Sequence, residues 1–130
     1  MSLSAKISAL AIRLAREIKT LVGPEHPGLA RAWVTFGYVG GVLQIAASHN
    51  VAGVTRQATG RYRITFATPF ADTHYCWIAF ARSTVNSGTA RMAMARQTSD
   101  AKTARYLEVA CATGSTSFAD TSEMNVVVYR

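Results

Sequence analysis

The chain has 130 residues, of which 49% are hydrophobic and 16% are charged, and this suits one compact domain with a short appendage. The composition excludes an intrinsically disordered chain, a collagen and a disulfide-stabilised mini-protein. The 14 basic and 7 acidic residues give a net charge of +7, which favours partners that carry phosphate or acidic sugars without choosing among them.

The first predicted element is an amphipathic helix over residues 4–22, capped by Ser4 and ended by Gly23 and Pro24. Its apolar side chains recur at spacings of four and three residues, which is the heptad pattern of a coiled coil. The residues of this seam are Ile7, Ala11, Leu14, Ile18 and Leu21. Charged residues interrupt the segment throughout, so we expect neither a secretory signal peptide nor membrane insertion.

A helix of this length is marginal alone in water, so its apolar seam has to pack against a partner. Two partners are open at this point: the remainder of the chain, or copies of the same helix. A wide seam that mixes isoleucine and leucine favours a coiled coil of three helices over one of two helices. We therefore expect a trimerising helical stem over residues 1–23, a linker over 24–30 and a β head over 31–130.

From Ala30 onward the apolar period changes to two, which predicts β-strands. The alternation is clearest where Tyr62, Ile64 and Phe66 are expected on a core face, with arginines on the solvent face. About seven strands separated by turn residues predict a mainly β head, an antiparallel β-sandwich. The expected strands are 31–37, 42–49, 61–68, 75–82, 89–97, 104–112 and 123–130.

Two cysteines, Cys76 and Cys111, lie inside predicted strands and lack metal-ligand spacing. We expect both cysteines to be buried free thiols. A disulfide between them remains an alternative if the two strands are neighbours. Most of the cations are arginines scattered along strands. That scatter favours the solvent face of a sheet, with a ligand patch as the second interpretation.

No motif in the chain predicts catalysis. The carboxylates of the β part form no recognisable acid and base pair, the histidines have no metal-ligand spacing, and nucleophile-elbow and phosphate-loop motifs are absent. We therefore expect a protein that is not an enzyme and that holds no cofactor and no metal. The stretch Arg61-Tyr62-Arg63 looks like a platform for single-stranded nucleic acid, but Tyr62 should point away from both arginines, so we expect no nucleic-acid partner.

An ordered set of residues runs through the β part. It comprises Ala32-Trp33-Val34-x-Phe36-Gly37, Ile45-Ala46-Ala47-Ser48-x-Asn50-Val51, Gly60-x-Tyr62-x-Ile64-x-Phe66-x-Thr68-Pro69-Phe70, Tyr75 and the closing Val126-Val127-Val128-Tyr129-Arg130. This set resembles the carboxy-terminal domain of bacteriophage tail-fibre proteins and related head-spike proteins, including fibres encoded by prophages. The resemblance is densest in the first half of the β part and loose over residues 82–122.

The resemblance implies a virion protein that is assembled in the bacterial cytoplasm, trimerises about a fibre axis and presents its tip to a receptor on the host surface. It carries over no catalytic residue. If successive strands run up and down from the stem, alternate turns and Arg130 reach the distal end. The receptor-binding residues expected there are Tyr38, Asp72, His74, Asp100 and Lys102.

The leading hypothesis is thus a homotrimeric phage fibre or spike head that binds a host glycan, an acidic one being favoured by the net charge. The first alternative is a structural connector that binds only other virion proteins. The second is a fragment of a depolymerase, which the lack of paired acids disfavours.

Overall fold

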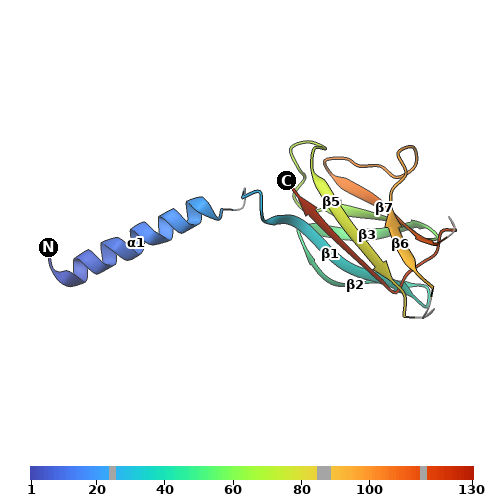
Figure 1. Cartoon of the computed structure of the whole chain (residues 1–130), viewed down its shortest axis with the longest axis horizontal. Helices are drawn as coiled ribbons and strands as arrows, with labels where there is room; N and C mark the ends of the chain where they lie inside the picture. Colours follow the sequence, from blue (N-terminus) through green and yellow to red (C-terminus); the bar gives the residue numbers. More distant parts are fainter. Residues whose placement is uncertain (24–25, 85–88, 115–116) are drawn as a thin grey trace.

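A computed structural model describes residues 1–23, 26–84, 89–114 and 117–130 of the chain. Within these residues the protein forms one helix and eight strands, arranged as two four-stranded antiparallel sheets (Figure 1). The elements are α1 (Leu3–Leu21), β1 (Ala30–Val39), β2 (Val42–His49), β3 (Val51–Ala58), β4 (Arg61–Phe66), β5 (Cys76–Arg82), β6 (Arg91–Met94), β7 (Tyr106–Thr113) and β8 (Glu123–Tyr129).

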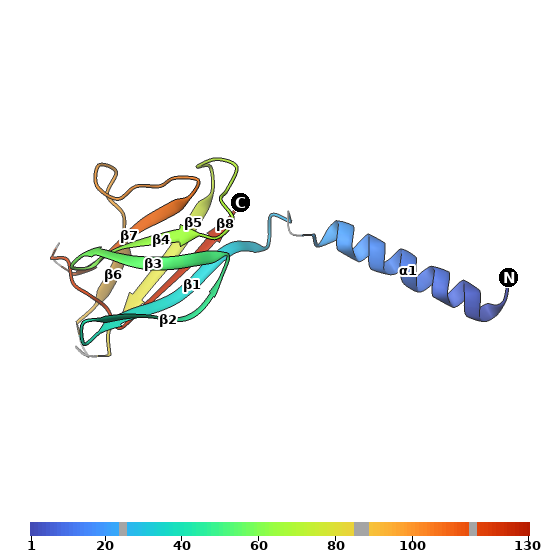
Figure 2. The ribbon, with the colours of Figure 1, turned by 180° about the vertical axis from the view of Figure 1, so that it is seen from behind.

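The helix α1 projects away from the β head, and none of its residues is buried (Figures 1 and 2). Its cap is Ser2 and not the expected Ser4: the Ser2 Oγ accepts a hydrogen bond of 3.1 Å from the Ala5 N–H. The helix ends before Gly23, as predicted, while Pro24 lies outside the described residues. None of the described helical segments is long and apolar enough to cross a bilayer.

The apolar seam of α1 stays open to solvent along its length. The exposed fractions of Ile7, Leu14 and Ile18 are 59%, 49% and 61%, and Ala11 and Leu21 are exposed as well. The first of the two partners that the sequence left open, the rest of the same chain, therefore does not cover this seam.

The two sheets face each other and enclose one core. Their strand orders are β2-β1-β8-β5 and β3-β4-β7-β6. Tyr62, Ile64 and Phe66 are buried as predicted, and the rings of Phe36 in β1 and Tyr62 in β4 meet edge to face at 5.1 Å between the sheets. Aromatic contacts thus join strands that lie far apart in the sequence.

The prediction of seven strands is wrong, because residues 51–58 form the additional strand β3. The chain passes from β2 to β3 through Asn50 alone, which adopts a left-handed backbone with φ of 52°. The Asn50 side-chain amide donates to the carbonyl oxygens of Arg31 and Thr68, at 3.1 and 3.2 Å. A one-residue corner leaves no turn signature in the sequence, so the two strands could not be separated there.

The additional strand reverses the direction of every strand that follows it. The end of the head near α1, here called the proximal end, holds Ala30 opposite Tyr129, which is opposite Cys76. The other end, the distal end, holds the turn after Val39 and the pair of Arg82 with Glu123. The C-terminus consequently lies at the proximal end of the head (Figure 1), and its expected distal position is wrong.

Both cysteines are free. Cys111 is buried in β7, as expected, whereas Cys76 is exposed on the outward side of β5. The strands β5 and β7 belong to different sheets, so the condition for a disulfide between neighbouring strands is not met.

Candidate binding surfaces of the β head

The five predicted receptor-binding residues do not share a surface. Tyr38 is at the distal end of β1, where the Arg56 guanidinium lies 4.6 Å from the centre of its ring. Asp72 and His74 lie at the proximal end, in the loop that precedes β5, and the Asp72 carboxylate is paired with Arg130. The expected common distal surface is therefore absent, since the missed strand β3 inverted the order of the turns.

The remaining two residues lie in the loop before β7, part of which pairs with β7 through a bridge between Lys102 and Leu107. The Asp100 side chain is almost fully buried beneath Arg61 and Arg96, and its carboxylate forms ion pairs with both of these arginines. Lys102 donates from Nζ to the Tyr75 carbonyl oxygen and lies 4.6 Å from the centre of the Tyr75 ring. The role of all five residues in receptor binding stays a prediction.

Arginines on the outer face of the β3-β4-β7-β6 sheet pair with carboxylates of the same chain. The Arg63 guanidinium donates twice to the Glu108 carboxylate, at 3.0 and 2.7 Å, from the neighbouring strand. Arg61 and Arg96 share Asp100. The first interpretation of the scattered arginines, a solvated sheet face, therefore holds for Arg61 and Arg63. Arg91 in β6 of the same sheet differs, because its Nε and NH1 atoms are buried.

Asp120, which belongs to no motif in the sequence, joins three other residues through its carboxylate. Its carboxylate accepts two hydrogen bonds from Arg56, at 3.0 and 2.8 Å, one from the Gly60 N–H at 2.9 Å and one from the Tyr62 hydroxyl at 2.8 Å. Burial alone would raise the pKa of Asp120, but these hydrogen bonds outweigh it and lower the pKa below its ordinary value. The segment before β8 is thereby fastened to β3 and β4.

All five carboxylates of the head have lowered pKa values, which makes the fold sensitive to acid. In the unfolded chain they titrate near their ordinary values of about 4. Their stabilisation is therefore complete above that pH and is lost as the pH falls through the lower values of the folded state. The residues are Asp72, Asp100, Glu108, Asp120 and Glu123.

We expect the thermal midpoint to fall by roughly 5–10 °C between about pH 6 and pH 3 at constant ionic strength. Differential scanning calorimetry across this range measures it. A midpoint that stays constant down to pH 3 would contradict the carboxylate networks.

The outer face of the β2-β1-β8-β5 sheet is apolar in its middle and proximal part. Ile78 in β5 stands opposite Val127 in β8, which stands opposite Trp33 in β1. Ile78 is 53% exposed and the neighbouring outward residue Phe80 is 73% exposed. We call this surface the apolar patch and define it as Trp33, Ile78, Phe80, Val127 and Tyr129. Contiguous apolar surfaces of this kind usually mark a contact with another molecule.

A groove of about 520 Å³ continues the same face toward the distal end, along β1 and β2. Gly37 permits its shape, because a Cβ there would overlap the Ser122 carbonyl that packs against β1. Polar groups of Thr35, Gln44 and Glu123 line the groove beside the apolar Val39 and Val42, among other residues. This mixture of polar and apolar groups suits a small polar ligand such as a sugar.

No family model, curated protein or solved structure matches this chain. Within the described ranges no three His, Cys, Asp or Glu side chains gather as a metal site would require. The functional argument therefore rests on the residues and geometry of the chain itself. Sequence reasoning missed the Asp120 network, the apolar patch and the distal groove, because each joins strands that are distant in the sequence.

Proposed function

We propose that the chain is the subunit of a homotrimeric phage or prophage-derived fibre or spike, whose helix forms the stem and whose head binds a glycan on the host surface. The observation that carries the proposal is the uncovered apolar seam of α1. Nineteen residues form this helix and none of them is buried. The resemblance of the β part to tail-fibre domains supplies the biological setting.

Burial of the seam supplies the free energy for assembly. Covering one leucine or isoleucine side chain contributes roughly 1.5–3 kcal/mol, whereas an isolated helix of this length is marginal in water. The seam residues Ile7, Leu14, Ile18 and Leu21 are each about half exposed or more. Copies of the same helix provide an apolar partner of matching length and spacing, and the width of the seam favours three of them.

The two outer faces of the head support the same arrangement. One sheet carries arginines neutralised by its own carboxylates, which suits a face in water. The other carries the apolar patch, which begins beside the end of the head that α1 enters. In a trimer about the stem axis, the apolar patch is the part of this face that we place against the neighbouring copies.

The distal end is then the part of the particle that reaches the host. It presents Tyr38 and the distal groove, whose polar and apolar lining fits a sugar. Three copies of a weak site on one particle multiply into strong attachment through avidity. The proposal assigns the protein no enzymatic activity and no cofactor.

Sedimentation equilibrium of the full chain tests the assembly, and a glycan array together with adsorption to host cells tests recognition. We expect a mass three times that of the single chain and binding to cell-surface glycans. A stable monomer at micromolar concentration would overturn the trimer. A trimer that binds virion proteins but neither glycans nor cells would establish the connector instead, and release of reducing sugar from host polysaccharide would establish a depolymerase.

A further inference from the structure

We infer that the distal end of the head holds an oxyanion site built on Arg91, which binds a carboxylate, sulfate or phosphate group of a molecule outside the chain.

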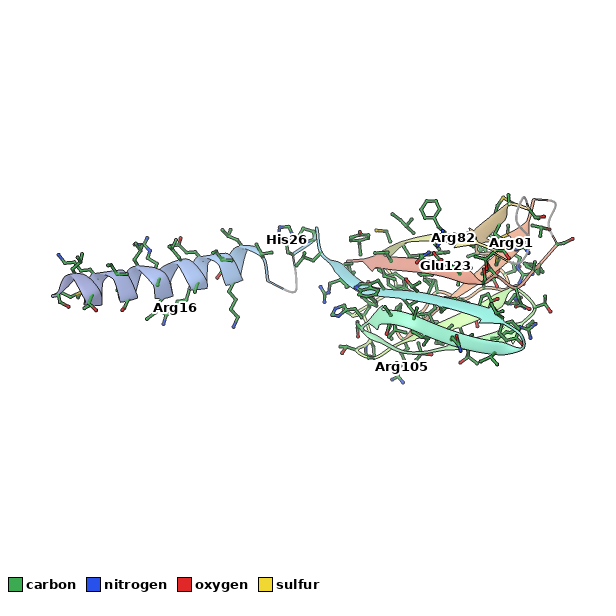
Figure 3. All side chains as sticks on the ribbon, turned by 90° about the horizontal axis from the view of Figure 1, so that it is seen from below. Arg16, His26, Arg82, Arg91, Arg105 and Glu123 are labelled. Atoms are coloured by element: carbon green, nitrogen blue, oxygen red, sulfur yellow. The ribbon has the colours of Figure 1, made fainter. Side chains whose placement is uncertain are left out.

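Arg91 places its guanidinium between the two sheets. It is the first residue of β6, and Ala93, two positions later on the same side of the strand, packs against the core opposite the buried Cys111. The Nε and NH1 atoms of Arg91 are buried and have no hydrogen-bond partner. Figure 3 shows Arg91 at the distal end of the head, the end that also holds Arg82 and Glu123.

The described residues hold no side-chain carboxylate that is free to neutralise this guanidinium. Of its seven acidic residues, five belong to the head, and each of these is already paired with another arginine. Glu17 pairs with Arg13 on the helix. Glu25 lies outside the described residues. We therefore place the charge partner of Arg91 on another molecule.

Burial makes this missing partner costly. A buried charge without a counter-ion or hydrogen bonds is strongly destabilising, and buried unpaired polar groups are rare in folded proteins. Other arginines of the head show the arrangement that the guanidinium prefers: Arg56 and Arg63 each donate two hydrogen bonds to one carboxylate. At Arg91 the Nε and NH1 donors have no acceptor within the described residues.

The geometry of the donors defines the ligand class. A guanidinium is a planar fork that donates two parallel hydrogen bonds to two oxygen atoms of one carboxylate, sulfate or phosphate. Acidic sugars of a surface polysaccharide carry such groups. In naming an acidic glycan as the receptor this inference rests on the proposed function, whereas oxyanion binding by Arg91 does not.

Thermal shift measurements on the full chain test the site, with sodium sulfate, sodium phosphate and sodium glucuronate as separate probes at an ionic strength held constant with sodium chloride. We expect a saturable rise of the midpoint with at least one probe. Arg91→Gln should abolish the rise, and Arg91→Lys, which keeps the charge but loses the fork, should weaken the apparent affinity by about 10-fold or more. If Arg91→Gln fails to fold, the weaker affinity of Arg91→Lys provides the test of the site.

Arg105→Gln is the matched control. Arg105 is an exposed arginine of the same head (Figure 3), and its replacement removes the same charge from the surface. It should leave the saturable rise unchanged. A rise that survives in Arg91→Gln, a rise lost equally in Arg105→Gln, or no saturable rise in the wild-type chain, as when water alone satisfies Arg91, would each overturn the site.

A second arm identifies the source of the anion. A uronate-containing polysaccharide and the same polysaccharide with its carboxyl groups reduced to alcohols are compared for binding to the wild-type chain and to Arg91→Gln. We expect the wild-type chain to bind only the unreduced polymer, and Arg91→Gln to bind neither. Equal binding of both polymers by the wild-type chain would overturn the acidic receptor. If the chain is a monomer and still shows the saturable rise, the oxyanion site is retained and the fibre proposal is refuted. If the chain is a trimer that attaches to cells but shows no such rise, the fibre proposal is retained and the oxyanion site is refuted.

Discussion

Replacing Leu14 and Ile18 together by glutamate should convert the proposed trimer into a monomer. Both side chains lie on the exposed seam of α1, at 49% and 61% exposure in the single chain. Six such side chains would meet in the proposed trimer, so the lost burial amounts to on the order of 10 kcal/mol of association free energy. Glutamates brought together at the same positions also repel one another. Sedimentation equilibrium of the full-length variant measures the change.

The head should remain folded in this variant, because no residue of α1 is buried and the core consists of strand and loop residues. The near-ultraviolet circular dichroism of the head should therefore be unchanged. The matched control is Ala5→Glu with Ala9→Glu, which adds two glutamates at the same spacing on the opposite side of the helix. The control should remain a trimer. If the seam variant also remains a trimer, the helix is not the assembly surface.

Asp120→Ala should destabilise the head by about 3–5 kcal/mol, a large part of the stability of an ordinary small domain. The change removes the acceptor of four hydrogen bonds and leaves Arg56, the Gly60 N–H and the Tyr62 hydroxyl without it. An unpaired buried group costs more than a hydrogen bond contributes. Urea unfolding measures the effect and is best done in the Leu14 and Ile18 double variant, where unfolding is not coupled to dissociation.

Two further variants separate the network from a general charge effect. Asp120→Asn keeps an acceptor oxygen and should lose less stability than Asp120→Ala. Asp72→Ala removes a carboxylate whose pairing with Arg130 is exposed to solvent, and it should change the urea midpoint little. Equal effects of Asp72→Ala and Asp120→Ala would show that the Asp120 network has no special role in the fold.

Local sequence patterns were sufficient to predict the elements that have one apolar face and one polar face. The seam from Ile7 to Leu21 predicted the helix, and the alternation of Tyr62, Ile64 and Phe66 predicted a half-buried strand. Such patterns fail where both sides of a strand are apolar. In β5 the residues from Cys76 to Ala81 are apolar at both parities, so only the pairing with β8 decides that Ile78 and Phe80 point outward.

The candidate binding surfaces depended on contacts that local patterns do not encode. Asp120 is about sixty positions from the Gly60 and Tyr62 groups that it binds. Two guanidinium nitrogens of Arg91 are buried without a partner, and the side-chain carboxylates of the head are paired with other arginines. Both facts depend on pairs of residues that are distant in the sequence. The error over the distal turns has one physical cause: the corner at Asn50 takes a single residue and inverted the direction of all later strands.

The sequence by itself determined that this chain has an amphipathic helix followed by a mainly β head, because each rests on interactions between residues close together in the chain. The tertiary structure decided which residues share an end of the head, which sheet face is apolar and that two guanidinium nitrogens of Arg91 are buried without a partner. These depend on strand direction and pairing, and the free energy that sets them comes from contacts between residues far apart in the sequence.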